Sequence, residues 1–188
     1  MNLETKKSTL IGLGSFFKES VLLYEDRAYK PQNELLAEEL EHATNLVNRV
    51  NHENGWFTKE SVLAVYKAWA DSLQESKVEQ WLSGYNWTRV TPEKVGVIMA
   101  GNLPLVGLHD ALSVFVSGHV LHAKLSSKDK SLMTVVLKVL QKLIGDEARF
   151  KVVEQLKDID WLIATGSDNS ARYFDYYFKE IKRIIRKN

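Results

Sequence analysis

The chain has 188 residues, of which 45% are hydrophobic, so it can bury a core of its own and is not a disordered segment. Its 25 Lys and Arg residues against 24 Asp and Glu residues leave no charge excess of the kind that binds nucleic acids or anionic membranes. No apolar run is long enough to span a membrane and no signal-peptide pattern opens the chain, so we expect a cytoplasmic protein. The lack of cysteine excludes disulfides and thiolate chemistry within these residues.

Residues 1–90 have the pattern of helices without strands, and we take them as an N-terminal helical region. The apolar face of a first helix is formed by Leu10, Leu13, Phe16 and Phe17. Gly12 and Gly14 weaken that pattern. A second helix is predicted over residues 33–51, and Thr58 can cap a third over residues 59–73. A short fourth helix ends near Gly84.

From residue 91 to residue 188 the pattern changes to short apolar strands that alternate with helices. The predicted strands are residues 94–100, 119–125, 149–154 and 160–166, with a further strand possible from residue 183. The predicted helices are residues 106–118, 129–145 and 167–183, the last because the aromatic run Tyr173–Phe178 has helical spacing. This alternation predicts an α/β fold, a doubly wound and mainly parallel Rossmann-like sheet.

Polar or small residues follow three of these predicted strands. Asn102 follows the first strand, Lys124, Ser126 and Ser127 end the second, and Gly166–Ser167 end the fourth. Parallel strands joined by right-handed crossovers place their carboxyl ends at one edge, where such sheets bind ligands. The free N–H groups of a helix that begins at Gly-Ser suit an anion such as phosphate.

Each of these residues also has an ordinary structural interpretation. Thr165–Ser167 can be a strand-to-helix turn with a cap, and Ser126 or Ser127 can cap the helix that follows. Lys124 can guard a strand edge against pairing, and Asn102 can close a turn with its own backbone. The residue pattern leaves both interpretations open.

Metal binding and the common glycine-rich phosphate loops are not expected. His109 falls on a predicted helix, while His119 and His122 flank a strand and point to opposite faces of it. The sequence contains neither G-x-G-x-x-G nor G-x-x-x-x-G-K-[ST].

Three segments taken together resemble a known family. The segments GNLPLVGLHDALSVFVSGH, AKLSSKD and IATGSDNSARYFDYYF are similar to the cofactor-binding half of the aldehyde dehydrogenase superfamily. They are closest to its acyl-CoA reductases, the family that includes the Lux-type fatty-acid reductase. The resemblance is strong over residues 90–188 and weaker before them. It implies an incomplete aldehyde dehydrogenase-like fold.

The resemblance implies a role for each residue at the predicted edge. Asn102 matches the asparagine whose amide holds the oxyanion of the thiohemiacetal, and Lys124 matches the lysine that contacts the adenosine ribose. Ser127 replaces a glutamate that would repel a 2′-phosphate, which favours NADP(H) over NAD(H) as the cofactor. Gly166–Ser167 match the pair beside the pyrophosphate, and Ser126 can add a hydroxyl there.

The chain departs from the family in lacking the cysteine that takes the acyl group as a thioester. The resemblance therefore implies the NADP(H)-binding part of an acyl-CoA reductase, truncated before the catalytic domain and inactive alone. It implies an acyl-CoA or other acyl thioester as the substrate. The helical region before residue 90 offers a docking surface for an acyl-transfer subunit, and an unpaired sheet edge offers one for a second copy of the chain. The alternative is a non-catalytic nucleotide-binding module, or a partner-docking module. The latter is suggested by the tryptophans of the helical region, Trp56, Trp69, Trp81 and Trp87.

Overall fold

The computed structural model describes residues 1–87 and 90–187. The chain divides into two compact units, one helical and one built on a sheet. The helical unit contains residues 1–87 and 134–146, and the sheet unit contains residues 90–133 and 147–187. Among the described residues, no helix is both long and apolar enough to cross a membrane.

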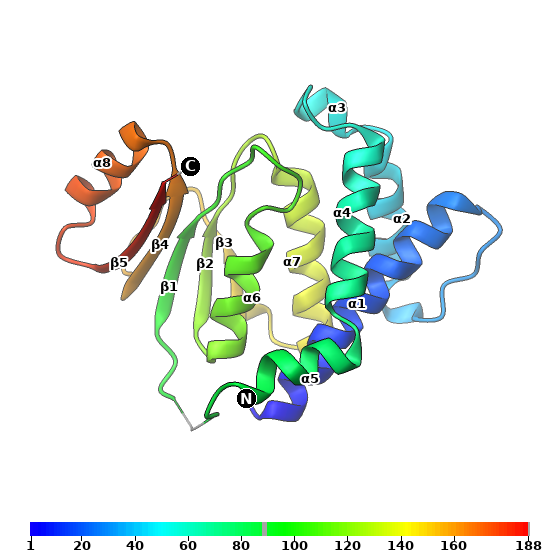
Figure 1. The fold of residues 1–188 in the computed structure, drawn as a ribbon, viewed down its shortest axis with the longest axis horizontal. Helices are drawn as coiled ribbons and strands as arrows, with labels where there is room; N and C mark the ends of the chain where they lie inside the picture. The colour runs from blue at the N-terminus through cyan, green and yellow to red at the C-terminus, as the bar shows by residue number, and fades with distance from the viewer. Residues whose placement is uncertain (88–89, 188) are drawn as a thin grey trace. The chain divides into compact units, whose positions relative to one another are not determined.

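The helical unit is built around α1 (Leu3–Glu25), which contacts the three helices α2, α4 and α5 (Figure 1). The other elements of the unit are η1 (Glu34–Leu36), α2 (Ala37–Val47), α3 (Val50–Glu53), α4 (Lys59–Ser72), α5 (Glu75–Ser83) and most of α7 (Lys130–Ile144). The predicted apolar face of α1 is buried, because Leu10, Leu13 and Phe17 have no exposed surface and Phe16 is 1% exposed. The prediction for this helix is confirmed.

The glycines of α1 permit close packing, which outweighs their low helix propensity. A Cβ placed on Gly12 would lie 2.9 Å from Cδ2 of Leu143 in α7, and one on Gly14 would lie 2.9 Å from the carbonyl oxygen of Leu73. The chain that follows α4 therefore approaches the backbone of α1 at Gly14. In the sequence these glycines weakened the prediction of a helix, whereas in the structure they lie where α1 packs closely against its neighbours.

The other helices of this unit follow the predicted pattern with two changes. Thr58 caps α4 in a reciprocal capping box with Ser61, as the sequence predicted for Thr58. The predicted helix over residues 33–51 is instead three short elements, η1, α2 and α3, interrupted at residues 48 and 49. Trp56 is 87% exposed, while Trp69, Trp81 and Trp87 are half-buried.

The sheet unit contains five parallel strands in the order β3-β2-β1-β4-β5. The strands are β1 (Lys94–Ile98), β2 (Val120–Lys124), β3 (Phe150–Val152), β4 (Trp161–Gly166) and β5 (Lys182–Lys187). The connecting elements are α6 (Leu108–Ser117), the first turn of α7, η2 (Glu147–Arg149) and α8 (Asp168–Tyr177). The predicted α/β fold with a parallel sheet is confirmed.

The two faces of the sheet carry different helices, which makes it doubly wound (Figure 1). Phe174 and Phe178, in and directly after α8, pack against the core formed by Ile159, Leu162 and Ala164. The alternate residue Ile163 of β4 lines a hollow together with Val114 of α6. Since successive residues of a strand point to opposite faces, α6 and α8 lie on opposite sides and define an α6 face and an α8 face of the sheet.

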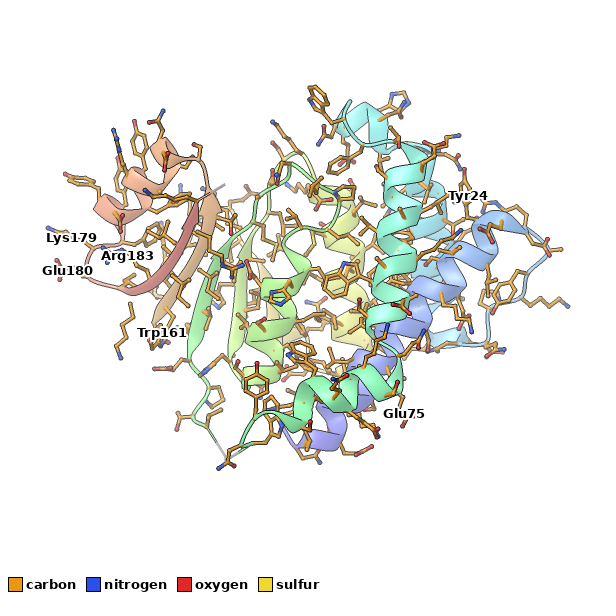
Figure 2. All side chains as sticks on the ribbon, in the orientation of Figure 1. Tyr24, Glu75, Trp161, Lys179, Glu180 and Arg183 are labelled. Carbon is orange, nitrogen blue, oxygen red and sulfur yellow. The ribbon has the colours of Figure 1, made fainter. Side chains whose placement is uncertain are left out.

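At the end of the chain, the possible strand from residue 183 is confirmed, but the helix before it is shorter than predicted. The helix predicted to reach residue 183 ends at Tyr177, and residues 182–187 form β5 in parallel register with the whole of β4. Figure 2 shows Lys179, Glu180 and Arg183 around the turn between α8 and β5, where Arg183 donates to Asp175 over 2.8 Å. Pairing with β4 outweighs the helical spacing of this segment.

The aromatic run on α8 is also less packed than its helical spacing predicted. Phe174 and Phe178 reach the core, but Tyr173, Tyr176 and Tyr177 are 64%, 73% and 70% exposed. The tyrosines contact one another instead: the rings of Tyr173 and Tyr177 are stacked, and Tyr176 meets Tyr177 edge-on.

Gly14→Ala is expected to lower the free energy of unfolding by about 1–3 kcal/mol, because the new methyl group would meet backbone atoms of Leu73 that cannot turn aside. Gly55→Ala is the matched control, since a Cβ there has open space and Gly55 has no positive φ. Urea unfolding of both variants checks the expectation. An equal free energy of unfolding for the two variants would show that α1 and Leu73 are not in the close contact that the structure has at Gly14.

Candidate functional site

The three strand ends singled out in the sequence meet at one edge of the sheet. In the register of β1, Ile98 pairs with Lys124 of β2 on one side and with Ala164 of β4 on the other. The N–H of Met99 donates to the carbonyl oxygen of Lys124 over 3.1 Å. Ile98, Lys124 and Ala164 therefore lie at the same level on three adjacent strands, at or near their carboxyl ends.

Gly101 lies where the loop after β1 passes the loop after β2. A Cβ on Gly101 would lie 2.3 Å from Oγ of Ser126 and 3.1 Å from Cβ of Lys128, so a side chain cannot fit there. Gly101 is buried by this contact, whereas the neighbouring Asn102 is exposed. The contact brings Asn102 and Ser126, two of the predicted site residues, into adjoining loops.

Asp129 fixes the loop between β1 and α6, and sequence reasoning assigned it no role. Its Oδ2 accepts a hydrogen bond from the N–H of Leu105 over 2.8 Å, and the residue is 2% exposed. Leu105 is buried and has a φ of 54°, a conformation that is strained for a residue with a side chain. The carboxylate therefore holds a strained loop in place from the residue directly before α7.

Lys124, Ser126 and Ser127 form the second part of the edge. Lys124 is exposed at the end of β2 and forms no ion pair with a carboxylate in the described part of the chain. Oγ of Ser126 accepts from the N–H of Lys128 over 3.3 Å, so Ser126 closes the turn ahead of α7. Ser127 is exposed. No acidic side chain stands at residues 124–128.

Gly166 and Ser167 form the third part. β4 ends at Gly166, and Ser167 is the N-cap of α8, where its side chain accepts from the N–H of Ser170 over 3.4 Å. The capping interpretation of Ser167 is therefore correct. It does not exclude an anion, because one cap hydroxyl satisfies only one of the several N–H groups that are free at a helix start.

An ion pair closes the α6 side of this edge. Arg186, which pairs in register with Thr165 of β4, contacts Asp110 in the first turn of α6. Burial acts to raise the pKa of Asp110, but the neighbouring His109 and the hydrogen bond from Arg186 outweigh burial and leave the pKa below its ordinary value. Asp110 is thus a buried carboxylate that ties α6 to the last strand. Its only signal in the sequence is that it is the first charged residue after Lys94.

The three histidines considered as metal ligands lie in different parts of the sheet unit. His119 accepts from the N–H of Glu93 over 3.1 Å at the amino end of the sheet, and His109 lies beside Asp110. His122 lies on β2, and its pKa is lowered by burial and by the nearby charges of Lys151 and Lys94. Within residues 1–87 and 90–187, no cluster of three or more metal-ligating side chains is formed.

No protein-family model matches the chain, and no curated protein matches its sequence. Solved structures do match its fold. An indole-3-acetaldehyde dehydrogenase in its apo form superposes with a TM-score of 0.68 at 15% identity, over 100% of this chain and 44% of that chain. The glyceraldehyde-3-phosphate dehydrogenase GapN of Methanocaldococcus jannaschii, complexed with NADP, gives a TM-score of 0.69 at 10% identity, over 100% of this chain and 42% of that chain.

A propionaldehyde dehydrogenase from the fucose-utilisation microcompartment of Clostridium phytofermentans gives a TM-score of 0.62 at 10% identity, over 98% of this chain and 42% of that chain. The chain thus spans less than half the length of these structures. At such identities the likeness concerns the fold. The chain has the architecture of part of an aldehyde dehydrogenase, as the sequence resemblance predicted.

Lys151→Gln is expected to raise the pKa of His122 toward its ordinary value of 6.5, because it removes one of the positive charges that disfavour the imidazolium. The stability that depends on neutral His122 is fully present above pH 6.5 and is lost as the pH falls below that value. The variant should therefore lose less of its free energy of unfolding over the same fall in pH. Proton NMR titration of the ring measures the pKa. Lys179→Gln, in the turn after α8, is the control, and an equal shift in both variants would contradict the expectation.

Proposed function

We propose that this chain is the NADP(H)-binding part of an acyl-CoA reductase that reduces a fatty acyl thioester to an aldehyde. One observation carries the proposal: the predicted site residues leave β2, β1 and β4 at the same edge. In the order β3-β2-β1-β4-β5, the direction of winding reverses between β1 and β4. Parallel α/β sheets bind dinucleotides at such a switch point, outside the carboxyl ends of the strands.

The residues at this edge fit a dinucleotide. The pyrophosphate would lie at Gly166–Ser167, where α8 provides free N–H groups and the positive end of its dipole. Lys124 is exposed two strands away and would contact the adenosine ribose. Ser126 and Ser127 offer hydroxyls and no negative charge, which suits NADP(H) better than NAD(H) for the ribose that carries a 2′-phosphate.

Asn102 is the proposed catalytic contribution of this chain. Its exposed side chain follows β1, next to the loop of Ser126. An amide N–H aimed at the thioester oxygen would stabilise the oxyanion that forms when the carbonyl carbon becomes tetrahedral. When bound, NADPH supplies the hydride that reduces the acyl group.

The cysteine nucleophile of such a reaction is not among these 188 residues. The proposal therefore requires that another segment or chain supplies it, together with much of the acyl site. The lack of cysteine equally favours an alternative, a nucleotide-binding or partner-docking module without catalysis. An open reading frame that continues into a cysteine-containing segment would support the reductase over this module.

The 188-residue chain is expected to bind NADPH more tightly than NADH, as measured by isothermal titration calorimetry at fixed ionic strength. Ser127→Glu should weaken NADPH binding by about tenfold, because a carboxylate near the 2′-phosphate costs on the order of 1 kcal/mol in a solvated site. NADH binding should change little. Ser117→Glu, which adds the same charge at the C-terminal end of α6, is the control. If Ser127→Glu weakened both dinucleotides equally, Ser127 would not face the 2′-phosphate.

A further inference from the structure

The α8 face of β2 and β3 carries a group of basic side chains. Phe150 of β3 packs against Phe115 of α6 with ring centroids 5.6 Å apart, so Phe150 and its register partner Leu121 lie on the α6 face. The next residues along, His122 and Lys151, are paired in register and lie on the α8 face. Lys124 lies two residues beyond His122 on that same face, at the carboxyl end of the strand.

This basic surface, formed by Lys124, His122 and Lys151, is open to solvent. Both lysines are exposed and His122 is half-buried. The connection from β3 to β4, residues 153–160, contains no helix, and it crosses the α8 face over β1, where Leu156 and Ile159 meet Gly96. Parallel sheets usually have both faces covered, so an open and charged area at this place is unusual.

The three groups repel one another when His122 is charged. Like charges directly opposite on neighbouring strands destabilise a sheet, and His122 and Lys151 are direct cross-strand neighbours. Burial is the main cause of the lowered pKa of His122, and the charges of Lys151 and Lys94 add to it, so this repulsion accounts for part of the shift. Neither Lys124 nor Lys151 forms an ion pair with a carboxylate elsewhere in residues 1–87 and 90–187. A bound anion would reduce the repulsion among these positive charges.

The dimensions of the surface suit one phosphate group. Residues two apart on a strand are about 7 Å apart, and paired residues on neighbouring strands are about 5 Å apart. The flexible stems of the two lysines can therefore converge on one dianion above β2. Neutral His122 can still donate one N–H to it.

We propose that Lys124, His122 and Lys151 bind the phosphate on the ribose of an adenosine cofactor, either the 2′-phosphate of NADPH or the 3′-phosphate of coenzyme A. This inference rests on the proposed function, which places the adenosine ribose at Lys124. It assigns two further residues, His122 and Lys151, which the resemblance did not identify. The basic surface begins at the edge where the ribose would lie and extends away from Gly166–Ser167. It would therefore bind the phosphate on the ribose and not the pyrophosphate.

Three small probes test the proposal with the 188-residue chain: adenosine 2′,5′-bisphosphate, adenosine 3′,5′-bisphosphate and 5′-AMP. The chain is expected to bind one bisphosphate about tenfold more tightly than 5′-AMP, and the preference should decrease as the ionic strength rises. A preference for the 2′,5′ isomer identifies NADPH as the source of the phosphate, and a preference for the 3′,5′ isomer identifies coenzyme A.

The variants Lys151→Gln and His122→Gln should each reduce the preference for the bisphosphate about threefold and leave the affinity for 5′-AMP unchanged. Lys179→Gln, which removes one exposed positive charge after α8, is the matched control and should have no effect. Circular dichroism melting of each variant establishes that it is folded. The more conservative Lys151→Arg should keep the preference.

Two results would overturn the proposal in distinguishable ways. If the chain bound 5′-AMP and both bisphosphates equally, or if Lys151→Gln left the preference unchanged, this phosphate site would be wrong while dinucleotide binding remained. If the chain bound none of the three probes and neither NADPH nor NADH, the proposed function would fail as well.

Discussion

The pairing of β1 with both β2 and β4 is the constraint on which the candidate site depends. β1 is the central strand of the sheet, and its register fixes Ile98 beside Lys124 and beside Ala164. The groups proposed to contact the nucleotide follow one of these three strands or its last residues, except His122 within β2 and Lys151 of β3. Because all the strands are parallel, their carboxyl ends reach one edge without any direct contact between distant side chains.

The loops that leave this edge are held by a few specific contacts. Gly101 permits the loop after β1 to pass against Ser126, and Asp129 accepts the N–H of Leu105 further along the same loop. The strained backbone of Leu105 is maintained because its side chain is buried and its N–H is bound. The exposed Asn102 thus lies between two fixed points, which is the rigidity that a group stabilising a transient negative charge requires.

Charge is distributed unevenly around the same edge. On the α6 face, Asp110 neutralises Arg186 in a partly buried pair. On the α8 face, Lys124 and Lys151 remain without a carboxylate partner among the described residues, on either side of His122. The sheet therefore presents uncompensated positive charge on the face where α8 begins, and an anionic ligand would be attracted to that face.

Local sequence patterns were enough to predict the fold class, most elements and the residues at the strand ends, because short apolar strands, helix caps and the alternation of elements are all local signals. They predicted α4 from the cap Thr58 and β1 from the run at residues 94–100. The helix after β4 was predicted to reach residue 183 but ends at Tyr177, because the pairing of residues 182–187 with β4 is a long-range contact that helical spacing does not reveal. The same holds for the roles of Gly14, Asp129 and Lys151, whose partners are distant in the sequence and close only in the fold.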